Sequence, residues 1–103
     1  SLSSSRCPQR GDTVVIHVEC FLEDGTKTDS TLDRNLPIRF KLGSKEVIEG
    51  LDESMVHLCE GQTAELTIPS LYAYGAEGCP PSIPPFAVLV YRVKLLSVEH
   101  SST

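Results

Sequence analysis

Apolar and polar side chains alternate along residues 13–21, and this alternation constrains the fold more than any other feature of the chain. One face carries Val14, Ile16, Val18 and Cys20, and the other carries His17 and Glu19 among its members. A period of two residues is typical of a β-strand with one buried face. His17 lies on the less apolar face, and we interpret it as an exposed strand residue rather than a metal ligand.

Three further segments show strand-like patterns, which are residues 37–42, 62–68 and 87–98. Within the third of these, Leu89, Tyr91, Val93 and Leu95 share one face. The run Glu23-Asp24-Gly25-Thr26 places Asp-Gly between two extended stretches, which predicts a tight hairpin turn. A polar bend is expected at residues 30–35. Together these patterns predict four or five antiparallel strands.

A single segment, residues 47–58, has the periodicity of an amphipathic helix. Ile48, Leu51, Met55 and Leu58 form one apolar stripe along it, and Gly61 follows its end. Residues 72–85 contain two glycines and four prolines, so they predict a long ordered loop. One helix must then cover one face of the sheet, which makes the predicted fold class α+β. A pocket is expected between the helix and the sheet, with the long loop at its rim.

The chain has 103 residues and a formal net charge of -5, which fits one domain and disfavours nucleic-acid or membrane-surface partners. No apolar run reaches the roughly 20 residues of a membrane span, and residues 1–10 lack the apolar centre of a signal peptide. A cytoplasmic or nuclear location is therefore expected. The four cysteines, Cys7, Cys20, Cys59 and Cys79, are scattered without a CxxC motif, so we interpret them as reduced thiols. No histidine stands at ligand spacing, and neither a metal nor a cofactor is expected.

The sequence also lacks the motifs of nucleophilic and phosphate chemistry, such as GxSxG and the Walker pattern. An apolar cup with a few polar groups is what remains. Such a cup suits a reaction that forms no covalent bond to the protein.

Several short motifs resemble the FK506-binding protein (FKBP) family of peptidyl-prolyl isomerases. They are, in chain order, Leu22-Glu23-Asp24-Gly25, Asp29-Ser30, Asp33-Arg34-Asn35, Leu42-Gly43, Val47-Ile48-Glu49-Gly50, Tyr72-Ala73-Tyr74-Gly75 and Ile83-Pro84-Pro85. The resemblance covers about residues 10–99 and implies a curved antiparallel sheet wrapped around one short helix. We accordingly divide the chain into a serine-rich lead or linker at 1–9, an FKBP-like domain at 10–100 and a tail at 101–103.

The resemblance also implies roles for individual residues. Tyr74 would donate its hydroxyl, and Ile48 its backbone N–H, to a ligand carbonyl. Asp29 would lie beside the twisting amide, held by Arg34. The pocket walls would be formed by Ile48 together with Phe40, Val47, Ile83 and Tyr91. Taken without the resemblance, Asp29 and Arg34 read as a surface ion pair, and Phe40 and Tyr91 as core residues.

Four positions depart from the family pattern. Active members have tryptophan where this chain has Leu51, and commonly have aromatic residues where it has Val18, Thr28 and Ile38. We therefore expect a weak isomerase for X-Pro bonds, with proline-containing peptides or client proteins as substrates and reduced binding of the macrolide FK506. The alternative is a catalytically silent binding or scaffolding module of a larger, chaperone-associated protein.

Overall fold

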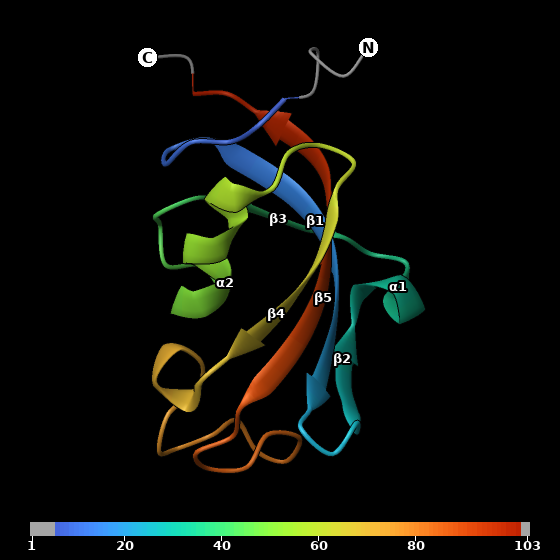
Figure 1. Cartoon of the computed structure of the whole chain (residues 1–103), viewed down its shortest axis with the longest axis vertical. Coiled ribbons are helices and arrows are strands. Elements are labelled where there is room, and N and C mark those ends of the chain that lie inside the picture. Colours follow the sequence, from blue (N-terminus) through green and yellow to red (C-terminus); the bar gives the residue numbers. More distant parts are fainter. Residues whose placement is uncertain (1–5, 102–103) are drawn as a thin grey trace.

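Five antiparallel strands form one sheet in the computed structural model, which describes residues 6–101. The strands are β1 (Thr13–Leu22), β2 (Lys27–Ser30), β3 (Ile38–Lys41), β4 (Thr63–Ile68) and β5 (Leu89–Glu99). Their order is β2-β1-β5-β4, and β3 pairs with β1 beyond the end of β2 (Figure 1). This architecture confirms the predicted α+β class with its antiparallel sheet.

The main helix, α2 (Glu49–Ser54), lies across one face of the sheet and continues into the 3-10 turn η2 (Met55–His57) (Figure 1). The helix predicted over 47–58 is therefore too long at both ends. Ile48 is extended, with φ -58° and ψ 149°, and only its carbonyl belongs to the helix, accepting from Leu51 and Asp52. The chain becomes extended again at Leu58. The apolar stripe is nevertheless correct, because Leu51, Met55 and Leu58 are buried.

A second short helix, α1 (Thr31–Arg34), replaces the predicted polar bend. The Ser30 side chain caps it by accepting from the Asp33 N–H at 3.1 Å. The buried Thr31 hydroxyl accepts from the Val18 N–H at 2.7 Å and docks the helix on β1. His17 is half-buried rather than exposed, because its Nδ1 lies 2.8 Å from the same Thr31 oxygen.

The core lies between α2 and the concave side of the long strands. On β1 and β5 alternate residues are buried, as the period of two predicts. From the opposite side Met55, in the 3-10 turn, is completely buried. The turn after β1 also forms as predicted. Gly25 has φ 93°, and its N–H donates to the Leu22 carbonyl at 2.9 Å.

The cysteine interpretation is wrong for two of the four thiols. Cys7 and Cys59 form a disulfide across 52 residues of sequence, whereas buried Cys20 and exposed Cys79 are free. The Glu60 N–H donates to the Arg6 carbonyl at 2.7 Å, which brings the start of the chain beside residue 59. No spacing motif signals such a pairing, because tertiary structure alone makes the two positions neighbours.

Candidate functional site

Three strands bring Asp29, Cys20 and Tyr91 into one row across the sheet. Cys20 on β1 pairs directly with Asp29 on β2 and with Tyr91 on β5. Residues directly opposite in antiparallel strands project to the same face. All three line a hollow of about 180 Å³, together with Thr28, Tyr74, Cys79, Pro80, Ser82 and Ile83.

The loop between η3 (Ser70–Tyr72) and β5 forms the opposite wall of this hollow. Cys79 and Ile83 exchange two backbone hydrogen bonds, of 2.8 and 3.0 Å, which fold residues 79–83 into a tight hairpin. At Gly78 a Cβ atom would lie 2.5 Å from the Ile83 carbonyl oxygen, so only glycine fits there. These contacts turn Ile83 inward, where it is buried. The predicted ordered loop is thus confirmed.

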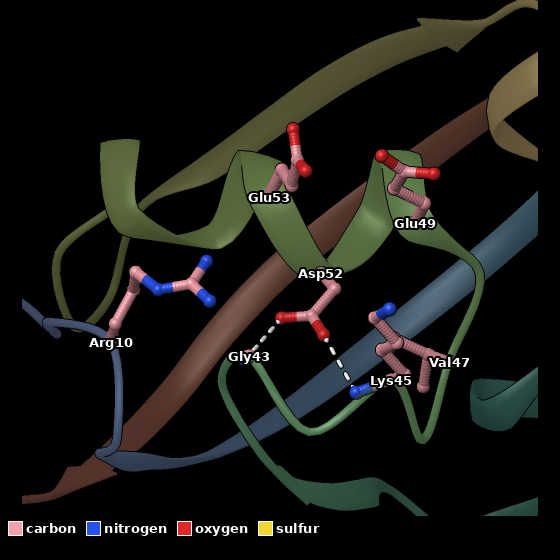
Figure 2. A pocket seen from close by; sticks show the side chains of 7 residues that line it. All are labelled: Arg10, Gly43, Lys45, Val47, Glu49, Asp52 and Glu53. Atoms are coloured by element: carbon pink, nitrogen blue, oxygen red, sulfur yellow. Dashed lines mark hydrogen bonds between the residues drawn. The ribbon is translucent and has the colours of Figure 1, made fainter.

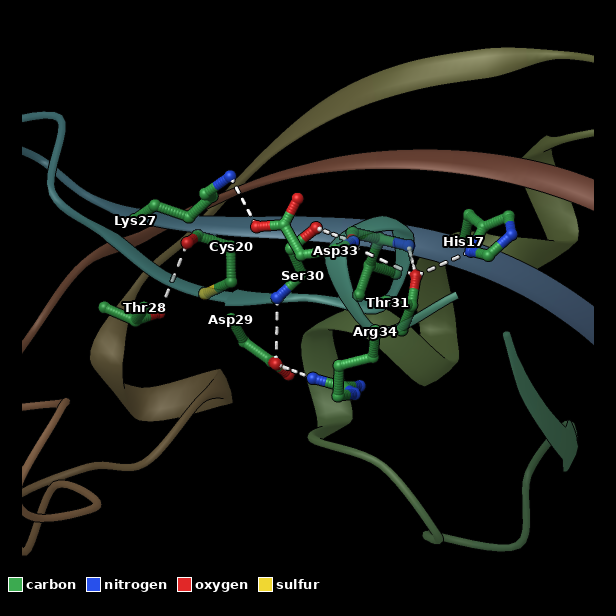
Figure 3. Close-up of polar contacts among 10 residues, drawn as sticks. His17, Cys20, Lys27, Thr28, Asp29, Ser30, Thr31, Asp33 and Arg34 are labelled. Atoms are coloured by element: carbon green, nitrogen blue, oxygen red, sulfur yellow. Dashed lines mark hydrogen bonds and ion pairs between the residues drawn. The ribbon is translucent and has the colours of Figure 1, made fainter. Parts of the chain in front are cut away.

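Asp29 and Arg34 form the ion pair that the resemblance implies (Figure 3). Asp29 Oδ1 also accepts from the Ser30 N–H at 2.9 Å. Both side chains are about half exposed, at 48% for Asp29 and 47% for Arg34, so the pair adds little to stability. Its effect is to hold the carboxylate at the rim of the hollow and to offset its charge.

Two phenols, those of Tyr74 and Tyr91, line the hollow. Burial is the main cause that raises the pKa of Tyr74, followed by its neighbours Cys79, Cys20 and Asp29, while a hydrogen bond with the Tyr91 hydroxyl partly offsets the shift. Burial is also the main cause that raises the pKa of Tyr91, followed by the neighbouring Cys20 thiol. Both phenols therefore stay protonated at neutral pH. The hollow combines neutral donors and one paired carboxylate with apolar walls, which suits binding of an uncharged amide.

The hollow includes only some of the residues that we predicted for the site. Thr28, Asp29, Tyr74, Ile83 and Tyr91 line it, and Arg34 reaches it through Asp29. The others lie elsewhere: Val18, Phe40 and Leu51 are buried in the core, and Ile38 and Ile48 are half-buried against it. Leu51 thus contributes to the core on which the hollow rests. The roles assigned to all twelve residues remain predictions.

Val47 lies in a second cavity, of about 230 Å³, beside α2 (Figure 2). Asp52 points from α2 into the turn beside it and accepts from the N–H groups of Gly43 at 2.8 Å and Lys45 at 3.2 Å. Charged side chains of both signs line most of this cavity, among them Arg10, Glu49 and Glu53. Such a lining does not match an apolar proline ring.

Four residues of the hollow were not among the predicted site residues, namely Cys20, Cys79, Pro80 and Ser82. The Asp-Gly turn does not by itself place Cys20 opposite Asp29. Next to the turn Phe21 pairs with Lys27, and a β-bulge between Cys20 and Phe21 shifts the register so that Cys20 pairs with Asp29. The other three belong to the loop, whose path no periodicity specifies.

Within residues 6–101, no group of three or more histidine, cysteine, aspartate or glutamate side chains is arranged to hold a metal ion. In the same part of the chain, no helix is both long enough and apolar enough to cross a membrane.

Comparison with known proteins gives a consistent match. The family model described as FKBP-type peptidyl-prolyl cis-trans isomerase matches residues 4–96. The chain is 44% identical over 99 residues to the peptidyl-prolyl cis-trans isomerase FKBP2 of Mus musculus, covering 93% of this chain and 71% of the relative. It is 45% identical over 96 residues to the FKBP2 protein of Homo sapiens, with coverage of 90% and 68%.

Proposed function

The chain belongs to the FKBP-type peptidyl-prolyl cis-trans isomerase family, and on this basis we propose that it isomerises X-Pro peptide bonds at the hollow beside Tyr74. The observation that carries the proposal is the meeting of Tyr74, Tyr91 and Asp29 around one small cavity. In our proposal a proline ring enters this hollow of about 180 Å³.

The chemistry required is rotation rather than bond cleavage. The planar amide is resonance-stabilised, so rotation faces a barrier of about 18–20 kcal/mol and takes tens to hundreds of seconds unaided. The twisted amide is less polar along its C–N bond than the planar form. An apolar wall formed by Ile83 and Tyr91 therefore disfavours the planar form, and a hydroxyl placed for the rotated carbonyl favours the twisted one. In our proposal Tyr74 is that hydroxyl, and no nucleophile takes part.

Isomerisation of a proline peptide, followed by NMR exchange spectroscopy, tests the proposal. The wild type should raise the exchange rate, and Asp29→Ala should lower kcat/KM about ten-fold because the carboxylate at the rim is lost. Glu23→Ala, a change at an exposed position in the neighbouring turn, is the matched control. A wild-type rate equal to that of Asp29→Ala would remove the proposal.

We further propose that the activity is weak and that macrolide binding is reduced. The support is the small side chains at Val18, Thr28, Ile38 and Leu51. An aromatic side chain buries about 150–250 Å², and replacing one with a smaller group removes about 1–2 kcal/mol of apolar contact. One such loss corresponds to a roughly 5- to 30-fold weaker complex. Of these positions only Thr28 lines the hollow, so Thr28→Phe should tighten FK506 binding, as measured by titration calorimetry.

The same four positions favour the second candidate, a silent binding module that works with a chaperone. The isomerisation rate separates the two functions. A wild-type rate at the level of the uncatalysed reaction, with measurable peptide binding, would favour the binding module.

The disulfide bears on the compartment in which the domain works. Disulfides persist in oxidising compartments and are rare in the cytosol, where thiols are kept reduced. We therefore infer an oxidising compartment from the Cys7–Cys59 bond, in place of the cytoplasmic or nuclear location expected from the lack of a membrane span and of a signal-peptide centre. Trapping thiols with an alkylating mass tag on cell lysis tests this. Before reduction only the two free thiols, Cys20 and Cys79, should take up a tag. Four tags per chain would contradict the inference.

A further inference from the structure

Phe86 is a bulky residue in an unfavourable backbone conformation. Its φ is 59°, in the left-handed region that side chains other than glycine and asparagine rarely adopt. Two other non-glycine residues share this region, and each has a local reason. Asn35 ends α1 and is of a type that tolerates the conformation, and the Lys45 N–H is held by Asp52. At position 86 the path of the backbone requires the left-handed conformation, but that path does not require an aromatic side chain.

The Phe86 side chain is also 71% exposed, so it does not serve the core. An exposed residue that has an unfavourable backbone conformation and does not contribute to the core often belongs to a functional site. Three more large apolar side chains of the same loop region are exposed, namely Leu71, Tyr72 and Tyr74. Exposed apolar side chains beside a cavity indicate a contact surface, and of these three residues Tyr74 lines the hollow.

The backbone places Phe86 at the rim of the hollow. Its N–H donates at 2.9 Å to the carbonyl of Gly75, the residue that follows Tyr74. It also stands three positions after Ile83, on the opposite wall. In Figure 1 this loop, coloured from gold to orange, lies at the end of the sheet where β1 turns into β2. Phe86 is thus anchored beside the lining residues without itself lining the hollow.

We propose that Phe86 is a specificity-determining residue, whose ring contacts an apolar side chain of the substrate near the proline; this rests on the proposed isomerase function. A polypeptide whose proline occupies the hollow must leave it in both directions, rising about 3.3–3.6 Å per residue. Residues one to three positions from the proline therefore cross the rim. The occupant of the apolar rim is this flanking stretch of substrate, because the rim is continuous with the hollow.

A leucine scan of the substrate tests the proposal. The parent peptide has one proline among alanines, and each variant has one leucine at one, two or three positions to either side. At one of these positions leucine should raise the wild-type kcat/KM about three- to ten-fold, from contact with an aromatic ring. Phe86→Ala and Phe86→Asn should lose this gain, and Phe86→Leu should retain most of it. All of these variants should treat the all-alanine peptide alike.

Two controls separate contact from stability. Asparagine tolerates the left-handed conformation, so Phe86→Asn should not lower the melting temperature. Leu32→Ala removes a comparably exposed apolar side chain, 54% accessible, from α1 and should keep the leucine gain. If Phe86→Asn keeps the gain at every position, the inference is wrong although the isomerase function stands.

Binding of the same peptides, labelled with fluorescein and followed by anisotropy, distinguishes the remaining outcomes. If the wild type accelerates no peptide, the proposed function fails. A leucine-dependent affinity that Phe86→Asn abolishes would still support the Phe86 contact in that case. Equal affinity of wild type and Phe86→Asn for every peptide would overturn it.

Discussion

At the scale of single residues, the hollow depends on side chains whose protonation is set by their surroundings. Tyr74 is 36% exposed, yet its partial burial and the groups around it raise its pKa above the ordinary value of 10.0. Asp29 stays near Arg34, whose charge offsets its own. The Tyr74 hydroxyl can therefore donate a hydrogen bond in the hollow without transferring its proton.

Replacing Tyr74 with phenylalanine should lower kcat/KM for a proline peptide about two- to ten-fold, the worth of one neutral hydrogen bond. The wild-type kcat/KM should stay flat up to about pH 9, because a raised pKa keeps the phenol protonated there. Tyr72→Phe is the matched control, since Tyr72 is similarly exposed but lies outside the hollow. Equal rates for wild type and Tyr74→Phe would show that the hydroxyl is not used.

At the scale of elements, the contact between α2 and β4 sets how closely the helix approaches the sheet. A Cβ atom on Gly50 would lie 2.5 Å from Ile68 Cγ2. That methyl group is attached directly to a β-branched carbon and has little freedom to move. Glycine in the helix is therefore explained by close packing rather than by backbone conformation.

Gly50→Ala should lower the free energy of unfolding by about 1–3 kcal/mol, because overpacking outweighs the better helix propensity of alanine. Urea denaturation measures the change. Adding Ile68→Ala removes the clashing atoms, so the double variant should lose less stability than the sum of the two single variants. Glu53→Ala, an exposed change on the same helix, is the control. A more stable Gly50→Ala protein would contradict this account of the packing.

At the scale of the whole molecule, two connections join the start of the chain to distant parts of it. The disulfide joins Cys7 to Cys59. The buried Asp12 carboxylate accepts from the N–H groups of Gln9 and Ser101, both at 2.9 Å, and pairs with His100 Nδ1 at 2.8 Å. Both ends of the described chain are thereby fixed to the sheet, far from the hollow.

Loss of the disulfide should lower the free energy of unfolding by about 4 kcal/mol, as expected for a closed loop of this length. Cys59→Ser and reduction of the wild type with dithiothreitol should have similar effects in urea denaturation. Reductant should not affect Cys59→Ser further, and Cys79→Ser should change stability by less than about 0.5 kcal/mol. Insensitivity of the wild type to reductant would rule out a stabilising bond.

Asp12 should make stability depend on pH in acid. Hydrogen bonds from the Ser101 and Gln9 N–H groups, followed by His100, lower the pKa of Asp12 from 3.8 to about 2. A lowered pKa in the folded state adds stability that is fully present above pH 4 and is lost as pH falls through about 2. Asp12→Asn should therefore lower the urea midpoint at pH 6, and the difference from wild type should disappear near pH 2. Glu65→Gln, at an exposed ion pair of 3.9 Å, should not show this pattern.

The sequence alone determined the long strands β1 and β5, the face that each of them buries, and the family. Alternation in Val14, Ile16 and Val18 and the turn at Gly25 are local, so a period and a turn type suffice to predict them. Tertiary structure decided the rest. It brought Cys7 to Cys59, aligned Cys20 with Tyr91 and placed Leu51 in the core rather than in the hollow. These contacts join residues far apart in the chain, and their geometry depends on how strands, helix and loop pack together, which no local pattern encodes.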